Sequence, residues 1–342
     1  NQAAVDSLLG QLVPTRLNVW YISQEEPTDS ELEFYVGPHS VEDLVPIEAA
    51  NALAAANRLG LTLPSKNGLL PANFDLREPS TEATAITVAD NVTFWLKGSD
   101  YFAGLPKGFA RIQLSSDLAL NSVDNQVYLS LWQSLYDLKQ ARLATEASIA
   151  GMSLNLGASN GITLTVSGFT DKQPELLERA LAGLRVAPTE LEFGQAVERY
   201  LRRIENSKRA FPYTRFTPLL GLLTREGRFS DTSLVLAASK ANLADFTAFT
   251  ETVLADSHVR GFFFGNYNEA DVQTAYQQIS KTLTPSASSG YARAGIYDPE
   301  PSATLMLNLE VPVDDLGMMY AFAAPEASVK NQALSRILAR HL

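Results

Sequence analysis

The feature that most constrains the fold is the stretch from residue 151 to residue 184, where a strand pattern runs directly into a helix pattern. Apolar residues occupy every second position from Ile162 to Val166, which is typical of a strand with one buried face. A shorter strand is expected at 152–156. The Asn160-Gly161 pair between the two strands favours a turn, because both residues tolerate positive φ. The segment therefore predicts a β-hairpin.

The residues after this hairpin have the spacing of an amphipathic helix. Thr170 or Asp171 can cap its N-terminus with a side-chain oxygen, and Pro174 suits the first helical turn. The apolar positions of the helix are Leu176, Leu177, Ala180, Leu181 and Leu184. A hairpin followed by a helix that packs over the same sheet is an α+β unit, so we expect a sheet covered by one layer of helices.

Composition narrows the class of protein. The 342 residues are 46% hydrophobic and 19% charged, as in a globular protein of two domains, or of one large domain with flanking pieces. The net charge of −11 disfavours nucleic acid and anionic membranes as partners, since both are polyanions. The absence of cysteine excludes disulfides, thiolate zinc sites and a cysteine nucleophile.

The pattern along the chain predicts its elements. Strands are expected at 17–22 and 32–36, a helix at 45–59, and an extended linker from 61 that is rich in proline and glycine. Strands at 92–96 and 109–120 are expected to pair with each other. Further helices are expected at 123–150, 189–209, 243–255, 269–283 and 326–342, an irregular helical run at 211–228, and strands at 259–265 and 304–313.

The three histidines do not form a recognisable metal site. His39 begins His39-Ser40-Val41-Glu42-Asp43, one residue short of His-x-x-Glu-His, so Asp43 would have to be the second ligand. We favour a turn there, since Gly37-Pro38 precedes it. His258 lies between a helix end and a strand, where a capping or core role is favoured, and His341 lies at the end of the chain.

The charged clusters are also better interpreted as solvated surface charge than as functional sites. The pairs Glu25-Glu26 and Asp314-Asp315 are adjacent in sequence, which is typical of loop charge rather than of a general acid and base. A basic cluster could grip an acidic tail or a peptide carboxylate, but interspersed glutamates favour a solvated helix face. Its members are Arg199, Arg202, Arg203, Lys208 and Arg209. We therefore predict no catalytic, cofactor-binding or metal-ligating residue in this chain.

Five stretches of the chain carry a family resemblance. They are RLNVWYIS with ELEFYV, LPSKNGLLPANFDL, YFAGLPKGFARIQLSS, GMSLNLGASNGITLTVSGFTDKQPELLERAL and VRGFFFGNYNEADV. Their order and spacing resemble the pitrilysin and insulin-degrading-enzyme family of inverted zinc metallopeptidases. The resemblance implies an α+β fold like that of mitochondrial processing peptidase, a two-layer unit of mostly antiparallel sheet covered by helices. It also implies a periplasmic protein that degrades short or unfolded peptides inside a chamber.

The resemblance also implies a division of the chain. Residues 1–60 resemble the end of the second family domain, and 61–86 an extended interdomain linker. Residues 87–284 would be a complete, non-catalytic third domain. The segment PSASSG at 285–290 would be a flexible linker, and 291–342 the start of a truncated fourth domain. Because the sequence begins without Met and ends within a helical pattern, we expect a piece of a longer protein.

The zinc motif of the family is expected elsewhere in that longer protein. The helix at 123–138 corresponds to the one that carries His-x-x-Glu-His in the first domain, but in this chain the positions are Tyr128, Leu131, Trp132 and Leu135. The parent would bind Zn²⁺, and this chain would bind none. Its partners would be peptide substrates and the N-terminal catalytic half of the same protein.

Two other functions remain open on the sequence alone. The chain could belong to a catalytically inactive relative that serves as a peptide-binding or assembly subunit. It could also be a hydrolase that uses His39, the less favoured of the two.

Overall fold

The computed structural model comprises two compact units, Asn1–Lys66 and Asn67–Leu342. The residues that the structure describes are 2–13, 16, 18–43, 51, 54, 65–78, 81–89, 92–116, 118, 122–159, 161–284, 295–297, 306, 317–321 and 328–341. The helix expected at 45–59 and the strand expected at 304–313 fall outside these residues, apart from isolated positions.

The first unit contains a helix and a short hairpin. Helix α1 spans Gln2–Leu9, and strands β1 (Ser30–Glu31) and β2 (Pro38–His39) pair in an antiparallel manner. The strands expected at 17–22 and 32–36 are wrong, since the described residues of both runs are irregular and Trp20 is 87% exposed. Apolar alternation gives a preference for extended backbone, but a strand also requires a neighbouring strand to accept its hydrogen bonds.

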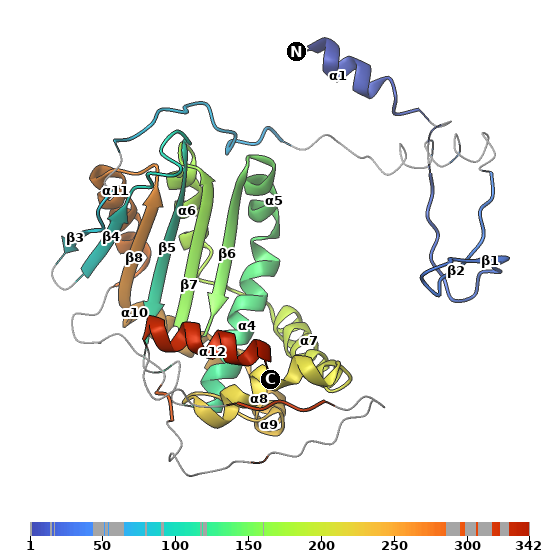
Figure 1. The fold of residues 1–342 in the computed structure, drawn as a ribbon. Coiled ribbons are helices and arrows are strands. Elements are labelled where there is room, and N and C mark those ends of the chain that lie inside the picture. Colours follow the sequence, from blue (N-terminus) through green and yellow to red (C-terminus); the bar gives the residue numbers. More distant parts are fainter. Residues whose placement is uncertain are drawn as a thin grey trace. The chain divides into compact units, whose positions relative to one another are not determined.

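The second unit is built on a six-stranded sheet with the order β3-β4-β8-β5-β7-β6 (Figure 1). The strands are β3 (Thr84–Ala89), β4 (Val92–Lys97), β5 (Lys107–Ser115), β6 (Met152–Ala158), β7 (Gly161–Phe169) and β8 (His258–Gly265). Strand β8 runs parallel to β4, and the other neighbouring pairs are antiparallel. The expected pairing of 92–96 with 109–120 is therefore wrong, because β8 lies between β4 and β5. Strand β5 also ends at Ser115, before residue 120.

The hairpin predicted from the sequence is confirmed. Strands β6 and β7 pair along their whole length, from Met152 opposite Gly168 to Ala158 opposite Ile162. The alternating apolar residues of β7 are buried. Gly168 has φ +106°, and a Cβ there would lie 2.2 Å from the carbonyl oxygen of Gly151. Glycine at this position thus lets the start of β6 approach the end of β7 closely.

Nine helices accompany the sheet in the described part of the second unit. They are α4 (Val123–Lys139), α5 (Ala141–Ile149), α6 (Gln173–Ala182), α7 (Glu190–Ser207), α8 (Pro212–Thr224), α9 (Asp231–Lys240), α10 (Leu243–Ala255), α11 (Glu269–Thr282) and α12 (Val329–His341). The expected helix at 123–150 is two helices that meet at Gln140. The amide of Gln140 donates to Tyr136 and its carbonyl accepts from Ala144, so the chain turns there without losing backbone bonds.

The run at 211–228 is more regular than expected. Helix α8 passes through Pro218 without interruption. Proline removes one helical hydrogen bond, but Pro218 and Thr214 are both exposed, so water can reach the carbonyl left without its amide donor. Helix α9 is an element that the sequence pattern did not predict.

The core lies between one face of the sheet and the helices. Helices α6 and α11 lie behind the sheet in Figure 1, and α4 and α5 run alongside β6. A row of paired positions crosses the sheet on the covered face, and all of its members are buried: Phe94, Gly261, Ile112, Leu164 and Leu156. The predicted fold class, an α+β sheet covered by helices, is confirmed.

Candidate functional site

His39 belongs to the first unit, and His258 and His341 belong to the second. His39 ends β2, and its Nδ1 lies 3.3 Å from the carbonyl oxygen of Gly37, so the ring belongs to the short hairpin. Asp43 is exposed in an irregular segment. His258 is the first residue of β8, opposite Ser115. The side chain of His341 lies outside the described residues. Within the described part of the chain, no group of three or more His, Cys, Asp or Glu could hold a metal ion.

Two members of the basic cluster at 199–209 pair with glutamates nearby in sequence. Arg202 pairs with Glu198, Lys208 pairs with Glu205, and the Arg203 guanidinium lies 5.1 Å from the centre of the Tyr200 ring. These contacts agree with the favoured interpretation of a solvated helix face. The acidic pair Glu25-Glu26 is exposed in the first unit, and Asp314-Asp315 lies outside the described residues.

The helix that was compared with the family's zinc helix is filled with packed side chains. Tyr128, Leu131, Trp132 and Leu135 of α4 are all buried. The Trp132 ring packs edge-on against Phe249 of α10, and its Nε1 donates to the Leu184 carbonyl at 2.9 Å. Burial raises the pKa of Tyr128, which keeps its hydroxyl neutral. Zinc needs lone-pair donors and an open coordination position, and this helix face has neither, so the residues do not fit the metal.

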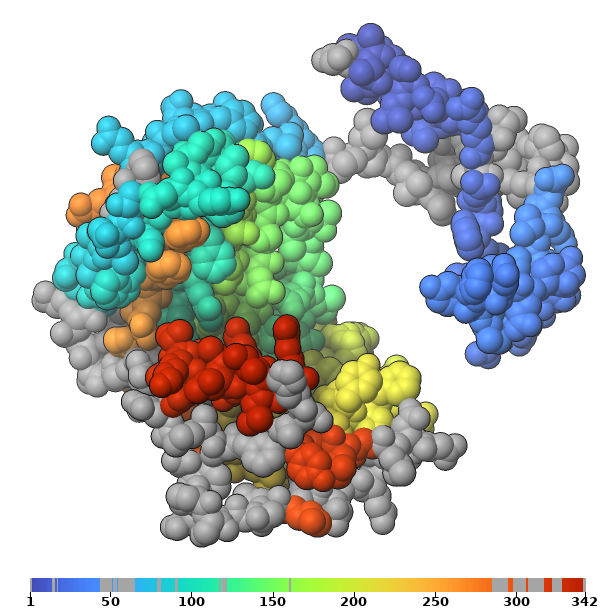
Figure 2. All heavy atoms as spheres, viewed as in Figure 1, coloured from blue at the N-terminus to red at the C-terminus, as the bar shows by residue number. Residues whose placement is uncertain are grey.

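The other face of the sheet carries no layer of described helices along most of its strands, and α12 crosses only its lower end in Figure 1. A row of paired positions crosses this face: Trp95, Phe262, Arg111, Thr165 and Asn155. Trp95 is 42% exposed, and Phe262 is 38% exposed and stacks on Phe264 at 6.3 Å between ring centres. Figure 2 shows atoms of the central strands reaching the surface on this side. The row offers two exposed aromatic side chains followed by polar ones, which suits contact with the varied side chains of an extended peptide.

Residues 67–78 form a segment, called the strap below, that is fastened to one end of the second unit. Leu69 is fully buried, and Asn67 donates through its side chain to the carbonyl of Glu146. The Asp171 carboxylate accepts from two strap amides, those of Ala72 and Asn73, at 2.8 and 3.1 Å. Asp171 was expected as a helix cap, as was Thr170. Neither caps α6, since Lys172 holds the N-cap position without a side-chain bond.

The second anchor of the strap is Asn266, which follows β8. Its Nδ2 donates to the carbonyl of Asp75 at 3.0 Å, and its Oδ1 accepts from the amide of Arg77 at 2.6 Å. The Arg77 guanidinium also pairs with Asp271 of α11. Asn266 is only 8% exposed, so it contributes both a donor and an acceptor to extended backbone in a largely buried setting. These contacts fix the path of the strap over the end of the sheet.

Sequence reasoning missed these anchors because each joins positions far apart in the chain. Asp171 stands just before a helix, so its position in the sequence favours a helix cap over a contact with a distant segment. Asn266 follows the buried strand β8, and its only signal is an amide side chain at the end of an apolar run. The sequence does mark 67–78 as extended, through Pro71 and the residues near it.

None of the helices in the described part of the chain is both long and apolar enough to span a bilayer. This agrees with the sequence, in which no apolar run reaches the roughly 18 residues of a membrane helix.

Comparison with known proteins relates the chain to one group of peptidases. It is 24% identical over 291 residues to Protease 3 of Salmonella typhimurium, covering 84% of this chain and 30% of that protein. It is 28% identical over 294 residues to insulin-degrading enzyme of Homo sapiens, covering 82% of this chain and 28% of that protein. The chain thus spans about 30% of the length of the curated relatives it matches.

The fold and a family model agree with these relatives. The crystal structure of pitrilysin superimposes on this chain with a TM-score of 0.69 and 24% identity. The match covers 86% of this chain and 32% of the pitrilysin chain, and it supports the fold. Residues 1–237 match a family model described as the middle or third domain of peptidase M16. Since that match covers more than half of the 342 residues, the chain belongs to the M16 peptidase family and corresponds to its middle domain region.

Proposed function

We propose that this chain is the non-catalytic central part of a pitrilysin-like zinc metalloendopeptidase that degrades short or unfolded peptides. The zinc site and its general base would lie in an N-terminal half of the same protein, which would be the principal partner of this chain. The resemblance favours the periplasm as its compartment. The domain boundaries proposed from the sequence, with a linker at 61–86 and a third domain at 87–284, belong to the same proposal.

The observation that carries the proposal is the packed face of α4. Metal-assisted hydrolysis needs ligands that hold the ion, a free position for water, and a base that takes the proton. Where such a helix would present these groups, this chain has Leu131, Trp132 and Leu135 inside the core. The role left for this chain is to help form the peptide-binding chamber and to position peptides in it. We assign its exposed sheet face to peptide contact.

The first experiment measures metal and activity in the full 342-residue chain. After chelation and re-equilibration with zinc, we expect well under one zinc per chain by mass spectrometry. We also expect no cleavage of a fluorogenic peptide, because the chain lacks a ligand set. One tightly held zinc per chain, or zinc-dependent cleavage, would show that the chain has a site of its own and would overturn the proposal.

The second experiment tests the exposed sheet face in the whole protein. Replacing Phe262 with serine removes apolar contact area from the proposed peptide surface, so we expect KM for a peptide to rise about fivefold. The zinc content should not change. Ile149→Ser is the matched control, because Ile149 is 69% exposed and belongs to α5 rather than to the sheet. An equal KM in Phe262→Ser and the unaltered protein would refute the assignment of this face to peptides.

A further inference from the structure

Positive charge is concentrated in one part of this acidic chain. Residues 199–228 contain eight arginines and lysines and two glutamates, a net charge of +6 (8 − 2) within a chain of net charge −11. Three of these eight groups pair with a carboxylate. Besides the pairs on α7, Arg215 lies 3.5 Å from Asp231 of α9. Among the described residues, Arg225 and Arg228 form no ion pair with a carboxylate.

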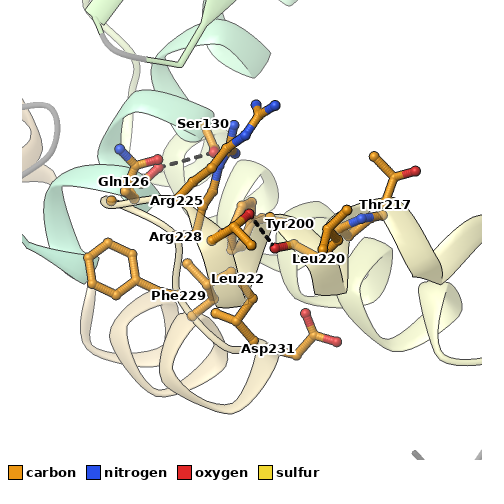
Figure 3. Close-up of a pocket in the computed structure, with 15 residues that line it drawn as sticks. Gln126, Ser130, Tyr200, Thr217, Leu220, Leu222, Arg225, Arg228, Phe229 and Asp231 are labelled. Carbon is orange, nitrogen blue, oxygen red and sulfur yellow. Dashed lines mark hydrogen bonds between the residues drawn. The ribbon is translucent and has the colours of Figure 1, made fainter. Parts of the chain in front are cut away.

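These two arginines line a cleft of about 500 Å³ among α4, α7, α8 and α9. Figure 3 shows both side chains running in the same direction toward Ser130 of α4. Tyr200 forms part of the wall, and Leu220 and Phe229 supply apolar surface. The cleft therefore combines two guanidinium groups, hydroxyl-bearing residues and an apolar wall. Asp231 also lines it, and its carboxylate pairs with Arg215.

The loop that carries the arginines is held in place. The Arg225 amide donates to Gly221, closing the last turn of α8, and the Glu226 amide donates to Gly295 at 2.9 Å. Gly227 has φ +69°, a conformation that glycine adopts without strain. Because the backbone is tethered on both sides of Arg225, the two like charges are positioned by the fold rather than by contact with each other.

We propose that this cleft binds the side-chain or C-terminal carboxylates of acidic peptides, with an adjoining apolar side chain against Leu220 and Phe229. Guanidinium groups form paired, charge-assisted hydrogen bonds with carboxylates, and two unpaired arginines at one cleft supply the donors for them. An acidic peptide is repelled by most of this chain, so the local positive charge directs it to one place. The inference rests on the proposed function, in which peptides reach this chain.

The test is peptide binding by the full chain, measured by fluorescence anisotropy. The probe is a labelled peptide of alternating Glu and Leu, compared with its counterpart in which every Glu is Gln. We expect the Glu peptide to bind more tightly, and Arg225→Ala with Arg228→Ala together to weaken its binding at least about tenfold. Raising the salt concentration should weaken binding in the unaltered chain, since these arginines are exposed.

Arg202→Ala is the matched control, because it removes one positive charge that already pairs with Glu198 outside the cleft. It should leave binding within about twofold of the unaltered chain. The charge reversal Arg228→Glu should favour a Lys–Leu peptide over the Glu–Leu peptide. A gain of affinity for the Lys–Leu peptide cannot result from misfolding, whereas a loss of affinity for the Glu–Leu peptide could.

Three results would overturn the inference. They are equal affinity for the Glu and Gln peptides, equal weakening by Arg202→Ala and the double variant, and displacement of the peptide by inorganic phosphate at far lower concentration than by acetate. The last would identify a phosphate site. The binding assay needs neither zinc nor cleavage, so a negative result would not contradict the proposed function. Conversely, a whole protein that cleaves no peptide would contradict the proposed function without affecting a measured peptide affinity.

Discussion

Replacing Trp132 with alanine is expected to lower the free energy of unfolding of the second unit by about 4 kcal/mol. Trp132 is fully buried in α4 and contacts the Phe249 ring, so alanine would leave a cavity that close-packed neighbours fill only in part. The substitution also removes the donor to the buried Leu184 carbonyl. Urea unfolding followed by far-ultraviolet circular dichroism measures the change.

The matched control is Trp95→Ala, which makes the same replacement on the exposed face of the sheet. Trp95 is 42% exposed, so its loss should cost about 1 kcal/mol or less. If both variants lose the same stability, α4 is not packed as described. The comparison also bears on function, because a loosely packed α4 would remove the structural argument against a metal site on that helix.

Replacing Asn266 with alanine is expected to release the strap from the end of the sheet. The substitution removes a donor to Asp75 and an acceptor for Arg77, which we estimate at about 2 kcal/mol together. Local opening of residues 67–78 should then become roughly 30-fold more frequent. Hydrogen exchange measured by mass spectrometry on peptides from this segment reports the change. Asn155→Ala, at an exposed position on β6, should leave the exchange unchanged.

The other anchor makes the strap sensitive to acid. Partial burial by itself would raise the pKa of Asp171, but the amides of Ala72 and Asn73 and the charge of Lys172 outweigh it, so the pKa is lowered. A carboxylate with a lowered pKa stabilises the folded state above its unfolded pKa, and this stabilisation is lost as pH falls through the folded pKa. Protection of the strap should therefore persist at neutral pH and disappear under strongly acidic conditions. In Asp171→Asn this loss with acid should be absent, and an unchanged pH profile in that variant would contradict the assignment.

The sequence predicts those parts of the fold whose signals are local. The β6–β7 hairpin follows from alternation between Ile162 and Val166 and from a turn signal between the strands. Helix α7 lies within the helix expected at 189–209. Its N-terminus carries a local capping box, in which the Thr189 side chain accepts from the Glu192 amide. In each case the residues that specify the element are the residues that form it.

The parts that the sequence does not predict depend on distant partners. Nothing within 92–97 or 107–115 reveals that β8 inserts between them, because strand pairing is decided by packing across the whole sheet. The strap anchors at Asp171 and Asn266 also depend on partners that are distant in sequence. The excess of positive charge at 199–228 is visible in the sequence, but the placement of Arg225 and Arg228 at one cleft depends on how α4, α7, α8 and α9 pack together.

The insertion of β8 has a consequence for biosynthesis. Strands β5, β6 and β7 can pair as soon as residue 169 has left the ribosome, and β3 can pair with β4 before that. The chain from α6 to α10 must still follow before β8 is made, so the facing edges of β4 and β5 stay open throughout that interval. Open edges of this kind recruit other strands, and pairings between distant segments form slowly. The sheet is therefore most vulnerable to aggregation during translation, and its closure depends on one late strand.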